Sequence, residues 1–140
     1  MRIEPFRVRH IAELKVQDAQ AARYLMMTED QYKAMESVPS FTAFEGGEVL
    51  GCGGILEYHP ERALIWSYVS ANAGRHFLKV HRAVSQFLDT TTYKRLEAEV
   101  AVDFENGHRW VRMLGFEVET PRARNHMPEG GDATIYVRIR

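Results

Sequence analysis

The sequence predicts an α/β (α+β) fold, with helices packed on a mixed, mostly antiparallel, twisted sheet of about six to seven strands with about four helices. Residues 41–69 carry three consecutive strand-like runs separated by turn signals. Residues 64–102 then read strand, turn, helix and strand, and residues 103–139 supply one more helix and two more strands. The length of 140 residues predicts a single domain over residues 1–140.

Composition and charge describe an ordinary globular chain, with 45% hydrophobic and 26% charged residues. The formal net charge of −1 argues against a dedicated nucleic-acid binder, which usually carries a strongly basic surface. The single cysteine, Cys52, excludes an intrachain disulfide and a cysteine zinc cluster, and its apolar surroundings indicate a core residue. No apolar stretch approaches the about 18 residues of a spanning helix, and the N-terminus lacks a signal-peptide core. We therefore expect no membrane association and a cytoplasmic location.

The N-terminal part of the chain predicts one strand and two helices. Residues 2–8 alternate apolar and charged side chains, and Pro5 is typical of an edge position or a bulge. The spacing of apolar residues then predicts a helix over residues 11–24. Thr-Glu-Asp-Gln at 28–31 is a capping-box pattern, which predicts a short helix that ends at Met35.

Two hairpins follow, built from three runs of strand-forming residues. The diglycine Gly46-Gly47 lies in the first turn, because glycine supplies the positive φ that tight hairpin turns require. Three further glycines in the second run indicate a bulge or a close approach of other backbone. These glycines are Gly51, Gly53 and Gly54, and the three runs cover residues 41–44, 49–56 and 63–69.

A turn of small residues at 70–74 leads from the third strand into the clearest helix of the chain. From Arg75 or His76 to about Leu88 the apolar residues share one face. Residues 95–102 alternate again, so the strand–helix–strand unit predicts a right-handed crossover between parallel strands.

The C-terminal part predicts a last helix and a last pair of strands. The helix covers residues 103–114, and Gly115 is its natural C-cap. Strands are expected at 116–119 and 134–139, joined by a long loop at 120–133.

This order of elements resembles the GNAT fold of acyl-CoA-dependent N-acetyltransferases over essentially the whole chain. Residues 44–51 resemble the second hairpin of that family, an acidic-glycine turn followed by a strand glycine. Tyr68-Val69 resembles the end of its fourth strand, and residues 108–116 are similar to its last helix with the Leu-Gly-Phe ending. The short turn and the aromatic-rich helix also resemble small GNAT-like proteins of tailed phages, including the internal virion protein family.

The resemblance implies an N-acyltransferase that transfers acetyl from acetyl-CoA, as co-substrate, to an amine of a small molecule or protein. In the resembled fold the fourth and fifth strands part and the acyl-pantetheine lies in the opening, so the backbone of Val69 and Ser70 is expected to bind it. The first N–H groups of a helix have no partner within the helix and attract anions, so those of Gly74, Arg75 and His76 are expected to face the pyrophosphate. The alternative is a plain strand-to-helix turn with a solvated basic face. The residues expected at the cofactor are Val69, Ser70, Ala71, Asn72, Gly74, Arg75, His76 and Lys79.

A general base for this reaction has to be a carboxylate or an imidazole near the strand ends. Asp103 and His108 follow the predicted parallel strand, and residues just past the C-terminal end of such a strand flank a binding crevice. Glu57 and His59, at the end of an earlier strand, are further candidates. Each has a structural alternative, since Asp103 can cap its helix and His108 can lie on the surface. No His/Asp/Glu grouping has metal-ligand spacing, so no metal site is expected.

Two departures from the family pattern motivate a second hypothesis. The Arg/Gln-x-x-Gly-x-Gly/Ala loop that holds the pyrophosphate is replaced by the shorter segment 71–75, and residues 109–111 lack the tyrosine that many members use as general acid. The second hypothesis is a catalytically silent GNAT-like phage virion or interaction protein, located in the host cytoplasm or the virion. The basic loop at 120–133 can hold an acidic substrate or a protein partner, or it can be a solvated hairpin. A nucleic-acid accessory protein is a third reading, which rests on this loop and the basic helix stripe.

Overall fold

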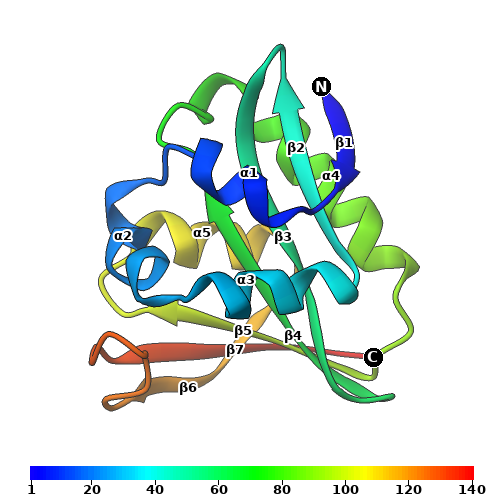
Figure 1. The fold of residues 1–140 in the computed structure, drawn as a ribbon. Helices are drawn as coiled ribbons and strands as arrows, with labels where there is room; N and C mark the ends of the chain where they lie inside the picture. The colour runs from blue at the N-terminus through cyan, green and yellow to red at the C-terminus, as the bar shows by residue number, and fades with distance from the viewer. The chain divides into compact units, whose positions relative to one another are not determined.

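The computed structural model describes all 140 residues. Five α-helices and one seven-stranded sheet make an α+β fold (Figure 1), which confirms the predicted fold class. The strands are β1 (Arg2–Pro5), β2 (Ser40–Glu45), β3 (Glu48–His59), β4 (Arg62–Val69), β5 (Arg95–Ala101), β6 (Glu117–Ala123) and β7 (Ala133–Ile139). The helices are α1 (Val8–Glu13), α2 (Asp18–Met26), α3 (Glu29–Ala34), α4 (Phe77–Thr90) and α5 (Glu105–Met113), with 3₁₀ turns at Met35–Ser37 and Gly74–His76.

The strand order in the sheet is β1-β2-β3-β4-β5-β7-β6. The β4–β5 ladder is parallel, as the strand–helix–strand pattern predicted, and it contains three residue pairs. The β1–β2, β2–β3, β5–β7 and β6–β7 ladders are antiparallel. The chain forms two compact units, Met1–Leu56 with Trp66–Thr91 and Glu57–Ile65 with Thr92–Arg140. A single domain over residues 1–140 stays a prediction.

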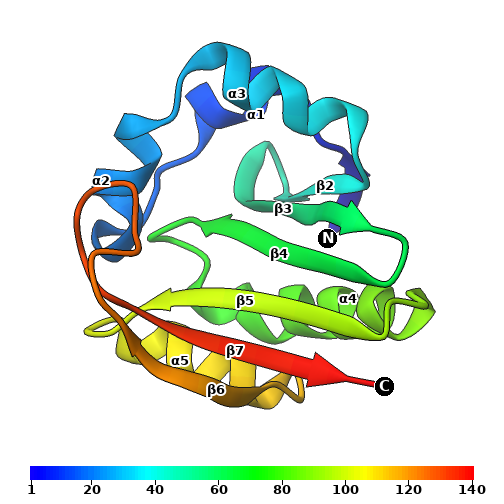
Figure 2. The ribbon, with the colours of Figure 1, turned by 90° about the horizontal axis from the view of Figure 1, so that it is seen from below.

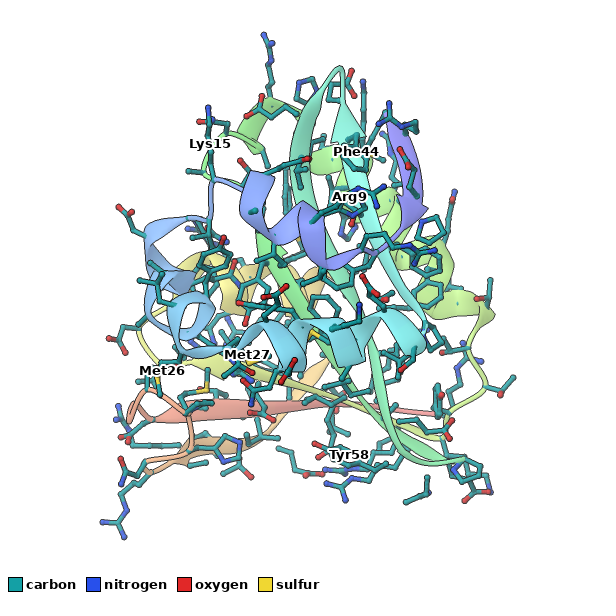
Figure 3. The ribbon with its side chains drawn as sticks, in the orientation of Figure 1. Arg9, Lys15, Met26, Met27, Phe44 and Tyr58 are labelled. Atoms are coloured by element: carbon teal, nitrogen blue, oxygen red, sulfur yellow. The ribbon has the colours of Figure 1, made fainter.

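In the first unit, helices cover both faces of β2 and β3. Helices α1 and α3 lie on one face and α4 lies on the other (Figure 2). Thr42 and Phe44 of β2 contact His10 of α1, and Figure 3 shows Phe44 on β2 close to that helix. Phe41 points to the opposite face and meets Phe87 of α4, with 5.0 Å between ring centroids. The alternation along β2 therefore supplies apolar contacts to both helical layers.

Aromatic side chains hold the N-terminal helices on the second half of β4. Phe6 is fully buried and contacts Trp66 edge to face, with 5.5 Å between centroids. Tyr68 makes similar contacts with Tyr24 of α2 and Tyr32 of α3, at 5.9 and 6.0 Å. Such pairs stabilise by about 0.5–1.5 kcal/mol beyond the area that they bury. The same core contains Cys52, whose thiol pKa burial raises to about 12, so the expectation of a core cysteine is confirmed.

The sequence expectation of one helix over residues 11–24 is wrong. Helix α1 already begins at Val8, where the first strand was expected to continue, and it ends at Glu13 before α2 begins at Asp18. Between the two helices Val16 forms an isolated antiparallel bridge with Ser70. The backbone at 15–17 bonds to Val69, the last residue of β4, and to Ala71 instead of to the preceding helical turn, and this interrupts the helical pattern. The predicted capping box at Thr28 is confirmed, with the threonine hydroxyl and the Gln31 side chain both bonded.

Two glycines of the first hairpin are explained by backbone geometry. Gly46 has φ +60°, which the tight turn between β2 and β3 requires. A Cβ on Gly54 would lie 2.4 Å from the carbonyl oxygen of Pro39, so only glycine fits there. The β2–β3 register also shifts between Ala43 and Phe44. The expected bulge and the expected close approach of backbone are therefore both present.

In the second unit, α5 packs along one face of β5 and β7 (Figure 2). Gly115 ends this helix with φ +92°, and its N–H donates to the carbonyl of Arg112, as its predicted role as C-cap requires. The predicted strand at 116–119 is too short, because β6 continues to Ala123. The β6–β7 ladder has two register shifts, and Pro121 lies within this irregular edge strand. A proline is typical of such an edge, and here it concealed the extension of the strand.

His10 makes the first unit sensitive to pH. Its side chain is 2% exposed, its Nδ1 accepts from the Arg7 N–H at 3.1 Å and it lies 2.7 Å from the Thr42 hydroxyl. Burial, with a smaller contribution from nearby Arg9, lowers its pKa below the ordinary value of 6.5. The unfolded chain therefore binds more protons than the folded protein as pH falls through 6.5.

We predict that the free energy of unfolding falls as pH decreases from about 7 to about 5, with up to about 1.4 kcal/mol per pH unit from His10. Urea unfolding across this range measures it. His10→Asn retains an uncharged acceptor near Nδ1 and removes this component of the slope. His59→Gln, at an exposed position, is the control and leaves the slope unchanged. Equal slopes for wild type and His10→Asn contradict the assignment.

Candidate functional site

The turn between β4 and α4 is organised by Ser70, a buried residue of the first unit. Its N–H donates to the Leu50 carbonyl at 2.8 Å, which ties the end of β4 to β3. Its hydroxyl accepts from the Asn72 N–H at 3.0 Å, and its carbonyl accepts from the Ala73 N–H at 3.2 Å. One serine thus closes the turn in place of a glycine-rich loop.

The start of the helical segment carries two unused donors. The N–H of His76 donates to the Ala73 carbonyl and that of Phe77 to the Gly74 carbonyl, closing the 3₁₀ turn. The N–H groups of Gly74 and Arg75 make no hydrogen bond, and a Cβ on Gly74 would meet nothing within 4 Å. Free N–H groups ahead of a helix of 14 residues form a site that favours anions.

Charged side chains of both signs surround this turn. The exposed Arg75 guanidinium lies 3.4 Å from the His76 ring and makes no ion pair. The Lys79 ammonium lies 3.7 Å from Glu45, and Glu48 accepts from the Asn72 side chain at 3.0 Å. Arg75 is therefore the cation left to meet an anion at the free N–H groups, whereas Lys79 is already paired.

The backbone of Val69, expected to bind acyl-pantetheine, is fully engaged. Its N–H donates to the side chain of Gln20 at 2.9 Å, and its carbonyl accepts from the Gln17 N–H at 3.1 Å. Both partners come from the start of α2. Local patterns could not predict these contacts, because they join residues about fifty positions apart.

His108 of the second unit lies in a fixed position. Its Nε2 is 2.9 Å from the Val102 carbonyl, which can only accept, so Nε2 carries the proton. Its Nδ1 is then the acceptor for the Tyr136 hydroxyl at 2.7 Å. Tyr136 is fully buried. His108 itself is half-buried, and both of its ring nitrogens are occupied by contacts that attach α5 to the end of β5 and to β7.

Asp103 and Glu57, also in the second unit, remain accessible. Asp103 is exposed and its carboxylate makes no hydrogen bond. The N-cap of α5 is Phe104, so the capping role considered for Asp103 is wrong. Glu57 is exposed and accepts from the Tyr93 hydroxyl at 2.7 Å. That hydrogen bond is the main cause of a raised pKa of Tyr93.

Sequence reasoning missed a carboxylate–imidazole pair on the second unit. Glu99 of β5 lies 2.9 Å from Nε2 of His126, and its side chain is 18% exposed. Glu99 is on the face of β5 opposite to that of Val100, which contacts α5. The alternation of β5 indicated that face, but nothing local connected it with His126 in the distant loop.

Glu97, two residues earlier on the same face as Glu99, has a different environment. Burial alone would raise its pKa, but hydrogen bonds from Arg62 and Arg95 outweigh this and lower it. Glu97 is therefore held ionised within a pair of arginines. Glu99, by contrast, is hydrogen-bonded to the imidazole of His126, a type of side chain that can itself act as a base.

The basic loop expected at 120–133 forms a hairpin that is closed by Asp132. Asp132 accepts from the Arg122 side chain at 2.6 Å and from the Asn125 N–H at 2.8 Å. The Met127 N–H donates to the Gly131 carbonyl at 2.9 Å. These contacts support the solvated-hairpin alternative for the loop, and a protein partner there stays a prediction.

No model of a known protein family matches the sequence, and no curated protein matches it significantly. Solved structures do match. Ard1 from Thermoplasma volcanium superimposes with a TM-score of 0.80 at 17% identity, over 99% of this chain and 96% of that chain. The GNAT-family acetyltransferase from Bacillus anthracis gives a TM-score of 0.68 at 14% identity, over 98% and 93%. The chain has the GNAT fold.

A third structure with the GNAT fold adds a cofactor to the comparison. It is yncA from Salmonella typhimurium, solved with its cofactor acetyl-CoA, with a TM-score of 0.75 at 15% identity over 99% of this chain and 93% of that chain. Identities this low show the fold alone, so the resemblance to GNAT proteins is confirmed at that level. The resemblance to phage GNAT-like proteins stays a prediction. None of the helices has both the length and the apolar character needed to cross a bilayer.

Proposed function

We propose that the protein is an N-acetyltransferase of GNAT type, which transfers acetyl from acetyl-CoA to an amine of a small molecule or protein. The observation that carries the proposal is the strand–turn–helix of the first unit, in which the N–H groups of Gly74 and Arg75 are free. The shared fold with acetyltransferases, one of them solved with acetyl-CoA, supports it.

The pyrophosphate of acetyl-CoA is assigned to the turn. Gly74 and Arg75 present the free N–H groups at the start of the helical segment, and the Arg75 side chain adds a positive charge, whereas the N–H of His76 is already bonded to the Ala73 carbonyl. Ala71 and Asn72 are exposed in the turn, whereas Lys79 acts only after releasing Glu45. The acyl-pantetheine is assigned to the edge of β4 at Val69, whereas the N–H and the carbonyl of Ser70, also expected to bind it, are already bonded to Leu50 and Ala73.

Acetyl transfer needs a neutral amine. The amine nitrogen attacks the thioester carbon, a C–N bond forms, the C–S bond breaks and the sulfur leaves as thiolate. The proton of the ammonium goes to a base of the protein, and the thiolate takes up a proton from solvent. Glu99 with His126 is the first candidate for this base, because it pairs a carboxylate with an imidazole, whereas His108 has no free ring nitrogen. Asp103 and Glu57 are the remaining candidates.

A second candidate function is a catalytically silent GNAT-like virion or interaction protein. Two features favour it: the short turn, and the buried apolar Val111 in the stretch where many GNAT enzymes place a tyrosine. The two functions differ in one measurable property. The enzyme releases coenzyme A from acetyl-CoA in the presence of amines, and the silent protein does not.

We predict that Arg75→Ala weakens acetyl-CoA binding about tenfold at low salt, since it removes a charge-assisted contact to phosphate. Isothermal calorimetry measures the affinity. Acetyl-pantetheine, which lacks the nucleotide and pyrophosphate, binds wild type and variant equally. Arg82→Ala, at an exposed position of α4, is the control. Absence of acetyl-CoA binding at millimolar concentration, or equal effects of the two substitutions, contradicts the assignment.

We predict that Glu99→Gln lowers kcat about a hundredfold without changing the KM for acetyl-CoA, because it removes the base but not the cofactor site. The loss becomes smaller as pH rises, since more of the amine is then already neutral. Glu105→Gln, exposed on α5, is the control. Steady-state rates across pH measure both effects. Full activity of Glu99→Gln together with a large loss in Asp103→Asn or Glu57→Gln would transfer the role to that residue.

A further inference from the structure

The second half of β4 has a backbone edge whose partner is not a strand. At the start of the short parallel ladder, the carbonyl of Glu61, the residue before β4, accepts from the N–H of Arg95. Backbone groups of alternate residues in a strand point to the same edge, so Ser67 and Val69 direct their groups to this edge as well. Both residues lie beyond the last of the three ladder pairs.

The side-chain amide of Gln20 occupies that edge. Its Nε2 donates to the Ser67 carbonyl at 2.8 Å, and its Oε1 accepts from the Val69 N–H at 2.9 Å. The Gln17 side chain donates to the same Oε1 at 3.0 Å and helps to orient it. One amide thus bonds to an acceptor and a donor two residues apart, as the backbone of a neighbouring strand would.

The residues just before Gln20 form hydrogen bonds with the rest of this edge of β4. The Gln17 N–H donates to the Val69 carbonyl at 3.1 Å, and the Lys15 carbonyl accepts from the Ala71 N–H at 2.8 Å. Figure 3 shows Lys15 in the connection between α1 and α2. The segment 15–20 therefore bonds to this edge from Ser67 to Ala71.

We propose that Gln20 competes with the pantetheine arm of acetyl-CoA for Ser67 and Val69, so that the arm binds by replacing the Gln20 amide. This inference rests on the proposed function. The pantetheine arm is an extended chain with two secondary amides, and extended amide chains bind to open strand edges through backbone hydrogen bonds. Each of its amides carries the same pair of groups, one donor and one acceptor, that Gln20 places on β4.

The exchange makes Gln20 a residue that sets cofactor affinity. In the wild type the arm gains hydrogen bonds to β4 only by breaking those of Gln20, so the net gain is small. Without the Gln20 amide, the Ser67 carbonyl and the Val69 N–H lack a protein partner. The arm then satisfies groups that were unpaired, and it binds more tightly.

Calorimetry with two probes tests the proposal: acetyl-CoA, and the nucleotide half of coenzyme A, which lacks the arm. We expect Gln20→Ala and Gln20→Met to bind acetyl-CoA about 5- to 30-fold more tightly than wild type, as two modest hydrogen bonds imply. The nucleotide half binds all three proteins equally. Gln86→Ala, at an exposed position of α4, is the matched control and changes neither affinity.

A measurement on the wild type removes any dependence on how the variants fold. The side-chain amide resonance of Gln20 is followed by NMR during titration with acetyl-CoA, and we expect it to shift and to exchange faster with solvent. An unmoved resonance at saturation overturns the inference. So do variants that bind acetyl-CoA no more tightly, or that bind both probes more tightly, and these outcomes leave the proposed function standing. Absence of acetyl-CoA binding by wild type and variants overturns both.

Discussion

The hydrogen-bonding requirement of β4 beyond its short ladder constrains much of the first unit. Buried backbone groups need partners, and the parallel ladder ends after three residue pairs. Lys15, Gln17 and Gln20 supply the partners for the part that follows. Because the backbone of this segment is used in that way, α1 and α2 cannot join into one helix. The aromatic contacts of Tyr68 with α2 and α3 then hold those helices on the same strand.

The same strand end determines the proposed cofactor site. Ser70 follows directly on Val69 and closes a turn that is too short for a glycine-rich phosphate loop. Two free N–H groups and one unpaired arginine replace that loop, while Glu45 and Glu48 lie on the neighbouring hairpin and reduce the positive potential. The proposed phosphate site is therefore built from few groups, and Gln20 is proposed to set the affinity of the pantetheine arm.

Local patterns predicted most of the fold. Alternation located the strands, the capping box located α3, and Gly115 located the end of α5, because each of these signals depends on neighbours in the sequence. The break between α1 and α2 could not be predicted in this way, since Val16 pairs with Ser70 across more than fifty residues. The candidate functional site was predicted less completely, because most of its contacts also join residues that are far apart in the sequence. The turn was visible in the sequence, whereas the contacts of Gln20, of Glu99 with His126 and of His108 with Tyr136 are all non-local.

The proposed site for acetyl-CoA runs along the end of β4 and the start of the helical segment that leads into α4. Titration of the isotopically labelled protein with acetyl-CoA, followed by backbone NMR, tests it most directly. We expect the largest shifts on the amides of Val69, Gly74 and Arg75. We also expect the shifts at Gly74 and Arg75 to recur with the nucleotide half of coenzyme A alone. Saturable binding that leaves these three amides unchanged, or no binding at all, would contradict it.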